Sequence, residues 1–230
     1  MIMSEFYGEP DITKQTTNFK EISEGMSLPQ VVFKTRTRVE SNDENPFDWK
    51  DMTTEDYFKG KKCVLFALPG AFTPTCSASH LPGYENNYNV FKALGIDEVY
   101  CLSVNDAFVM RKWGLDQGLE EDMTPGSLGF KNVKLIPDGA CQFTRGMGMN
   151  CTWDSERGFG ERSWRYSCYV VDGVIKKLFV EQPKIQNSQA PKYNFNKHTP
   201  VNIQTLIRYK AAHHNYCIFV PKKRADFQAQ

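Results

Sequence analysis

The sequence predicts an α/β domain with a mixed central sheet flanked by helices. Two short apolar runs, CVLFAL (63–68) and EVYCLSV (98–104), are typical of buried strands, and each is followed by a segment with helical periodicity. A later stretch, RYSCYVVDGVIKKLFV (165–180), contains two apolar runs joined by Asp-Gly, which is a strong hairpin signal. Strand–helix–strand units favour parallel pairing and the hairpin adds antiparallel strands, so we expect both kinds of pairing.

The N-terminal quarter contributes three expected segments. Residues 1–25 are polar and have no periodicity, which indicates a flexible arm. The alternating stretch VVFKTRTRV (31–39) predicts a strand and is followed by a polar turn. TTEDYF (53–58) then predicts a short helix that begins with a threonine cap.

Two helices and a strand are expected in the central part of the chain. One helical face is formed by Tyr84, Tyr88, Phe91 and Leu94. Pro82 should kink or interrupt this helix upstream of them. AFVMRKWGLDQ (107–117) predicts a second helix, with Asn105 or Asp106 as its cap and Gly118 as its end. VKLIPDG (133–139) predicts a strand that leaves through a turn.

The composition changes after the hairpin. EQPKIQNSQAPKYNFNKHTP is polar and contains prolines, so we expect a surface excursion, and VNIQTLIRYKAA (201–212) predicts a packed helix. We therefore expect a flexible arm over 1–25, one domain over 26–184 and a C-terminal extension over 185–230 that completes or decorates the domain. The order of elements resembles a thioredoxin-like domain.

Composition excludes several classes of protein. Of the 230 residues, 40% are hydrophobic and 24% are charged, as in globular proteins. The net charge is +1, from 28 basic and 27 acidic residues, which gives no electrostatic footprint for nucleic acid or for an anionic membrane. No run approaches the ~18 apolar residues of a membrane helix. The first residues, MIMSEFYGEPDITKQ, do not have the layout of a signal peptide, so we expect a cytoplasmic protein.

The chain has 7 cysteines, an odd number, and no CxxC pair. This pattern indicates reduced thiols rather than a secreted disulfide framework. Cys63, Cys101 and Cys168 lie within predicted strands and fit small buried hydrophobic residues.

Cys76 has a different setting. In LPGAFTPTCSASHLPG (68–83), Pro69 and Pro74 stiffen the loop that delivers Cys76 to the start of a helix. A free cysteine has a pKa near ~8.5, and only its thiolate is a good nucleophile. A helix N-terminus and a guanidinium are two devices that favour the thiolate. Thr73, three residues earlier, can turn its hydroxyl into the same pocket, which suits a small polar substrate such as a hydroperoxide.

Several blocks together resemble one known family. Pro69, Thr73 and Cys76 match the P-x-x-x-T-x-x-C signature of peroxiredoxins. The longer strings PGAFTPTCSASHLPGY, SVNDAFVMRKWG and RSWRY followed by VVDGVIK resemble the peroxiredoxin-five-like, or type II, branch. The resemblance runs from about residue 26 to residue 180.

The resemblance implies a thiol peroxidase that reduces hydrogen peroxide and alkyl hydroperoxides through a cysteine sulfenic acid. Cys76 would be the nucleophile, Thr73 would orient the peroxide, Arg165 would stabilise the developing charge and Pro69 would shield the site from water. Three further candidates for substrate binding are the backbone at Ala71, and the side chains of His80 and Arg162. A purely structural role for His80 or Arg162 stays open.

The resemblance also bears on how the enzyme is reduced after each cycle. Some relatives have a resolving cysteine shortly after the hairpin, but EQPKIQNSQAP has none. We expect glutathione with glutaredoxin, or thioredoxin, as the reductant. Cys151, after GMGMN in an expected loop, and Cys101 are candidate resolving thiols. A homodimer is expected from the family, with the loop near Ala71 and Phe72 compatible with an apolar contact.

Other classes of protein are less consistent with these residues. A thioredoxin-fold binding or chaperone protein would not need both Thr73 and Arg165. A thiol–disulfide oxidoreductase would need a CxxC pair. A metal site is not expected, because Cys76 and His80 supply only two ligands, and we expect no cofactor.

Overall fold

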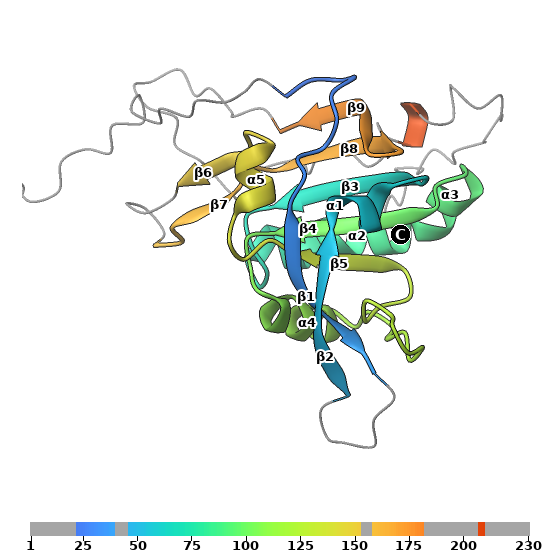
Figure 1. Cartoon of the computed structure of the whole chain (residues 1–230), viewed down its shortest axis with the longest axis vertical. Coiled ribbons are helices and arrows are strands. Elements are labelled where there is room, and N and C mark those ends of the chain that lie inside the picture. Colours follow the sequence, from blue (N-terminus) through green and yellow to red (C-terminus); the bar gives the residue numbers. More distant parts are fainter. Residues whose placement is uncertain (1–21, 40–45, 153–157, 182–206, 210–230) are drawn as a thin grey trace, which may run out of the picture.

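The computed structural model describes residues 22–39, 46–152, 158–181 and 207–209 (Figure 1). Its central sheet has five strands in the order β5-β4-β3-β8-β9. Their bounds are β3 Lys62–Leu68, β4 Glu98–Ser103, β5 Val133–Pro137, β8 Tyr166–Val171 and β9 Val174–Val180. β4 pairs in parallel with β3 and β5, whereas β8 pairs antiparallel with β3 and β9. The predicted mixed sheet is confirmed.

Helices cover both faces of this sheet. The helices are α1 Thr54–Phe58, α2 Leu81–Asn86, α3 Tyr88–Ala93, α4 Ala107–Asp116 and α5 Gln142–Gly146, with a π-helical turn, Cys76–His80, directly before α2. On one face, Val64, Phe66 and Val99 pack against α2, α3 and α4. On the other face, Leu65, Tyr100 and Leu102 pack against α1 and α5. The fold is therefore the predicted thioredoxin-like arrangement of a sheet between helices.

The predicted helix caps are present. Thr53 accepts a hydrogen bond from the Asp56 backbone, and the Asp56 side chain accepts one from the Thr53 backbone, which makes a capping box for α1. Asp106 caps α4 by accepting from the Phe108 and Val109 backbones, each at 2.9 Å. Gly118 follows α4 with φ +72°, the left-handed conformation in which glycine ends helices.

The sequence does not predict three of the strands, β2, β6 and β7. The strand predicted over 31–39 is present as β1 (Val32–Arg38), and it pairs antiparallel with β2 (Phe47–Thr53). β2 has no alternating pattern, and most of its side chains are exposed. β6 (Asn150–Thr152) and β7 (Glu161–Ser163) form another small antiparallel sheet. Cys151 therefore lies in a strand, and the expected loop at this position is wrong.

The β8–β9 hairpin turns at Asp172 and Gly173, as predicted. Both residues have positive φ, 50° and 72°, which is the geometry of the tight turn that Asp-Gly favours. The register shifts by one residue between Tyr169 and Val170, where the pairing changes from Val170 opposite Ile175 to Tyr169 opposite Lys177. This bulge moves every later residue of β9 by one position relative to β8.

The ends of the chain are only partly described. Residues 1–21 and most of the expected extension over 185–230 lie outside the described residues, so the domain boundaries remain predictions. Residues of the expected arm do contact β9: the Gly25 N–H donates to the Ile175 carbonyl at 2.7 Å. Of the helix predicted over 201–212, residues 207–209 are helical and Ile207 packs into the core. Within the described ranges, no helix has the length and apolar character needed to cross a membrane.

Candidate active site

The loop that follows β3 is held in place by the end of β4. Pro69 and Gly70 are buried directly after β3. The Ala71 N–H donates to Oδ1 of Asn105 at 3.0 Å, and the same oxygen accepts from the Ser103 hydroxyl at 2.7 Å. The Ala71 N–H is thus engaged within the protein, which differs from the expectation that it faces a substrate oxygen.

Thr73 closes the loop and begins the helix. Its hydroxyl donates to the Gly70 carbonyl at 2.8 Å, and its own carbonyl accepts from the Ser77 N–H at 3.0 Å. Because a hydroxyl has one proton and two lone pairs, this donation leaves Thr73 Oγ1 able to accept a further hydrogen bond. Phe72, between Ala71 and Thr73, has φ 61° and an exposed side chain.

Cys76 lies in the first turn of the helix that starts at Pro74, as predicted. The backbone then widens into the π-helical turn, in which the Leu81 N–H donates to the Cys76 carbonyl five residues earlier. The wide turn falls directly before Pro82, whose missing N–H already interrupts the regular ladder of helical hydrogen bonds. The interruption predicted for Pro82 is confirmed.

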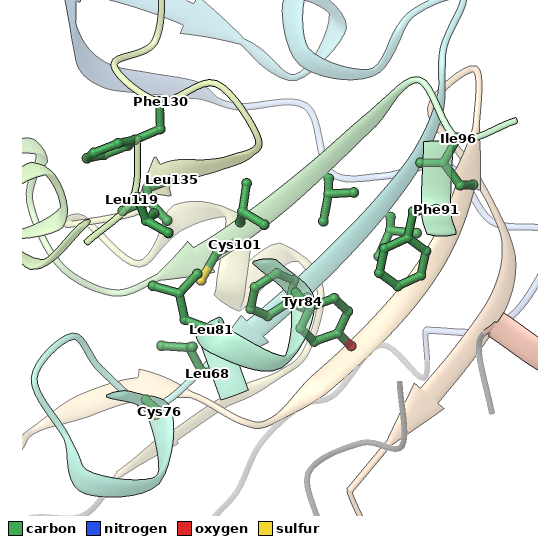
Figure 2. Close-up of a cluster of buried hydrophobic side chains, with 14 of the residues drawn as sticks. Leu68, Cys76, Leu81, Tyr84, Phe91, Ile96, Cys101, Leu119, Phe130 and Leu135 are labelled. Atoms are coloured by element: carbon green, nitrogen blue, oxygen red, sulfur yellow. The ribbon is translucent and has the colours of Figure 1, made fainter. Parts of the chain in front are cut away.

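The helix is anchored to α4 at the residue directly after Cys76. Ser77 Oγ accepts a hydrogen bond from the indole of Trp113 on α4 at 3.0 Å. The Cys76 side chain is 0% exposed and belongs to the apolar cluster that includes Leu68 and Leu81. Figure 2 shows Cys76 at the edge of this cluster, on the helical turn, with Cys101 deeper inside.

Arg165 completes the surroundings of Cys76. It lies between β7 and β8, and its side chain is 2% exposed. Its Nη1 is 3.4 Å from Cys76 Sγ and 3.3 Å from His80 Nδ1. Its Nε donates to Oε2 of Glu181 at 2.9 Å. The structure therefore brings the predicted residues Cys76, His80 and Arg165 together in one buried cluster.

His80 is a neutral member of this cluster. Burial, and after it the charge of Arg165, lowers the pKa of His80 to about 3. Since Arg165 can only donate, the contact with Nδ1 makes this nitrogen the acceptor and places the ring proton on Nε2. His80 is then a hydrogen-bond acceptor for Arg165 at neutral pH, which agrees with the structural role that the sequence leaves open for it.

Arg162 and Cys151 lie in a different place. They are paired residues of the β7–β6 ladder, and Cys151 Sγ donates to the Arg162 carbonyl at 3.5 Å. The Arg162 guanidinium donates from Nη1 to the Val104 carbonyl at 2.6 Å. These contacts agree with the structural role that the sequence leaves open for Arg162. The loop position that suggests Cys151 as a resolving thiol is not present.

The remaining thiols predicted to be buried are buried. Cys63, Cys101 and Cys168 are all 0% exposed within β3, β4 and β8. Burial raises the pKa of Cys63 to about 12, and it also raises the pKa values of Cys101 and Cys168. In the part of the chain that is described, no three His, Cys, Asp or Glu side chains gather in a way that could hold a metal ion.

Two residues that shape the site are missed by sequence reasoning. The sequence indicates Asn105 only as a helix cap, yet its side chain fixes the loop at Ala71. Glu181 belongs, by composition, to a polar segment after the hairpin. A regular two-residue hairpin would have placed Val180 opposite Arg165, and only the bulge brings Glu181 there.

Comparisons with known proteins agree with this geometry. Residues 24–194 match the Redoxin family. The chain is 56% identical over 155 residues to a peroxiredoxin of Synechocystis sp., covering 67% of this chain and 76% of that protein. It is 45% identical over 158 residues to the hybrid peroxiredoxin hyPrx5 of Haemophilus influenzae, covering 69% of this chain and 57% of that protein.

A solved structure leads to the same family. Reduced Prx3 of Vibrio vulnificus, crystallised in complex with H₂O₂, has a TM-score of 0.61 and 32% sequence identity, covering 85% of this chain and 99% of that one. The Redoxin match covers the sheet, the loop before Cys76 and the β8–β9 hairpin in one continuous span. The chain therefore belongs to the Redoxin family and, within it, to the peroxiredoxin-five-like branch of the peroxiredoxins, which are thiol peroxidases.

Proposed function

We propose that Cys76 is the peroxidatic nucleophile and that the chain reduces hydrogen peroxide and alkyl hydroperoxides. The observation that carries this proposal is the contact of 3.4 Å between Arg165 Nη1 and Cys76 Sγ in the first turn of a helix. A guanidinium keeps its charge at neutral pH, so it favours the thiolate over the thiol. The similar Vibrio vulnificus protein was crystallised with H₂O₂, which supports a peroxide substrate for this chain.

The reaction transfers one oxygen atom to sulfur. The Cys76 thiolate attacks the hydroxyl oxygen of the peroxide, an S–O bond forms and the O–O bond breaks. The product on the enzyme is a sulfenic acid, and the leaving hydroxide or alkoxide takes a proton to become water or an alcohol. Arg165 stabilises the negative charge that develops on the leaving oxygen, as oxyanion donors do in acyl transfer.

The loop orients the peroxide and protects the site. Thr73 Oγ1 donates to Gly70, so its lone pairs can accept the peroxide O–H and align the O–O bond with the sulfur. Pro69, buried after β3, removes one backbone N–H from this wall and limits the entry of water. The Ala71 backbone shapes the wall but its N–H is committed to Asn105.

The sulfenic acid is reduced by an external thiol. A first thiol condenses with it to a mixed disulfide and water, and a second thiol releases Cys76 as a thiolate. We propose glutathione with glutaredoxin, or thioredoxin, as the source of these electrons. Because Cys76 is 0% exposed, the donor reaches it only when the first helical turn opens. Cys101 and Cys151 are the resolving thiols to be tested against this external route.

We propose a location and an oligomeric state for the protein. A peroxidase that depends on a thiol donor needs a reducing compartment, so we propose a cytoplasmic location. We also propose a homodimer. The side chain of Phe72 is 50% exposed in a strained loop beside the site, and burying it against a second copy would remove that exposed apolar surface.

Peroxide consumption by the purified protein tests the proposed function. The assay has two arms, glutathione with glutaredoxin and thioredoxin with its reductase, and each is run with the native chain, Cys76→Ser, Cys101→Ser and Cys151→Ser. We expect turnover in at least one arm that is lost in Cys76→Ser and kept in the other two variants. Turnover that survives in Cys76→Ser would refute the assignment of the nucleophile.

A further inference from the structure

Glu181 is attached to the active-site segment by three contacts. Its carboxylate Oε2 accepts from Arg165 Nε at 2.9 Å. Its backbone N–H donates to the Arg165 carbonyl at 3.0 Å, and its own carbonyl accepts from the Trp164 indole at 2.8 Å. The carboxylate side chain is only 11% exposed. Glu181 is therefore held next to Arg165 by both its backbone and its side chain. Its ion pair with Arg165 is largely buried, unlike an ion pair on the protein surface.

The carboxylate fixes the direction of the guanidinium. Arg165 uses Nε for Glu181 and Nη1 for both Cys76 Sγ and His80 Nδ1. Because the guanidinium is planar and rigid, an acceptor placed at Nε also sets the direction in which Nη1 points. Without that acceptor, rotation about the last bonds of the side chain would move Nη1 away from the sulfur.

The charges of the cluster change during the proposed reaction. Arg165 is buried and cannot lose its proton, so it needs a negative partner. Of the groups it contacts, His80 is neutral, which leaves Glu181 and the Cys76 thiolate as anions. Oxidation to a sulfenic acid removes the charge of the thiolate. Glu181 is then the anion that keeps the buried guanidinium paired.

We propose that Glu181 is a positioning residue for peroxide reduction: its carboxylate directs Arg165 toward Cys76 and keeps this buried cation paired after the sulfur has been oxidised. The proposal rests on the proposed roles of Cys76 and Arg165. It adds a residue that does not touch the peroxide and acts only through the guanidinium.

The two functions of the carboxylate can be separated by two substitutions. Glu181→Gln keeps an oxygen that can accept from Nε but removes the negative charge. Glu181→Ala removes both the acceptor and the charge. In the described part of the chain, the charged or titratable groups that face Cys76 are Arg165, His80 and the Cys101 thiol of β4, and both substitutions leave these three residues in the sequence.

The first readout is the pH dependence of Cys76 alkylation by iodoacetamide, followed by mass on the peptide that contains Cys76. In Glu181→Gln the thiolate becomes the sole anion next to Arg165 among the residues that the structure describes. We expect the midpoint of the alkylation profile to move to lower pH by about 0.5 to 1 unit. A role in packing alone would not move this midpoint. This readout needs no peroxidase activity.

The second readout is the rate at which reduced protein reacts with one equivalent of H₂O₂. We expect Glu181→Gln to stay within about fivefold of the native rate, and Glu181→Ala to be slower by about 10- to 100-fold, because an undirected guanidinium no longer stabilises the leaving oxygen. Glu55→Gln and Glu55→Ala are the matched controls, since Glu55 makes an exposed ion pair with Lys59. Both controls should keep the native rate and midpoint.

The outcomes separate this inference from the proposed function. A native chain that does not react with H₂O₂ refutes the proposed function. A reactive native chain with an unchanged midpoint in Glu181→Gln and a native rate in Glu181→Ala overturns the role of Glu181. If Glu181→Ala does not fold, Glu181→Gln decides: a lower midpoint supports the role and an unchanged midpoint refutes it.

Discussion

Nη1 of Arg165 lies 3.4 Å from Sγ of Cys76, although the two residues are 89 positions apart in the sequence. The antiparallel pairing of β3 with β8 explains this proximity. Ala67 near the end of β3 lies opposite Tyr166 at the start of β8, so the loop after β3 meets the residue before β8. The buried cation beside the sulfur is thus a direct consequence of the sheet topology.

Replacing Arg165 by lysine tests whether the planar guanidinium, with its several N–H donors, is needed in addition to the positive charge. Arg165→Lys keeps a positive charge but cannot hold Glu181, His80 and Cys76 with the same geometry. We expect the rate with H₂O₂ to fall by about 100-fold or more, as when an oxyanion donor is removed. Stopped-flow measurement of the reduced protein gives this rate. The control is Arg145→Lys at an exposed ion pair with Glu161, and an equal loss in both variants would contradict the prediction.

Thr73 is expected to act through its hydroxyl. Thr73→Val keeps the shape of the side chain but removes the group that bonds Gly70 and is free to accept from the peroxide. A lost hydrogen bond of this kind costs about 1–3 kcal/mol, so we expect a rate lower by about 10- to 100-fold. Thr73→Ser, which keeps the hydroxyl, should remain within a few-fold of the native rate. A slow Ser variant together with a fast Val variant would show that the methyl group matters instead.

The lowered pKa of His80 leads us to expect that the folded chain becomes less stable in acid. Its pKa is about 3 in the folded chain, against an ordinary value of 6.5. Between these two pH values the unfolded chain binds a proton at His80 that the folded chain does not bind. The contribution of His80 to the free energy of unfolding is therefore complete above about pH 6.5. Below that pH the free energy of unfolding falls by up to about 1.4 kcal/mol per pH unit. Urea unfolding at pH 7, 6, 5 and 4 measures this slope. His80→Asn should have a flatter profile, and identical slopes would contradict the prediction.

Any side chain larger than hydrogen at Gly114 is expected to clash with the core beneath α4. A Cβ at this position would lie 2.3 Å from Cζ of Phe130, whose ring is buried. Gly114→Ala should therefore lower the free energy of unfolding by about 1–3 kcal/mol, the usual cost of overpacking, despite the better helix propensity of alanine. Thermal or urea unfolding tests this value. Lys112→Ala on the exposed side of the same helix should change stability by less than about 0.5 kcal/mol.

The sequence is sufficient for the main sheet and for the reactive loop. Continuous apolar runs identify β3 and β4 because both faces of these strands are covered, and Asp172-Gly173 identifies the hairpin because few residues tolerate its backbone angles. The motif around Cys76 is also predictable, since the prolines and the small residues of its loop have local effects.

The remaining features depend on pairing that local patterns do not reveal. β2 is mostly exposed, so its residues carry no alternation, and it forms a strand because β1 lies beside it. The partner of Arg165 depends on a bulge at Tyr169 and Val170, and a shift of one residue exchanges Val180 for Glu181. The side chain of Asn105 reaches a loop that is 34 positions away.

The identity of the cysteine that first reacts with peroxide is the most direct test of the account. Reduced protein is treated with one equivalent of H₂O₂ in the presence of dimedone, which traps sulfenic acids, and the labelled peptide is found by mass. We predict one adduct, on Cys76, and none in Cys76→Ser. Cys63, whose pKa is raised to about 12, has about one thiolate per ten thousand thiols at pH 8 and should stay unlabelled. A Cys76 that remains a thiol, or a first adduct on another cysteine, would contradict the proposed mechanism.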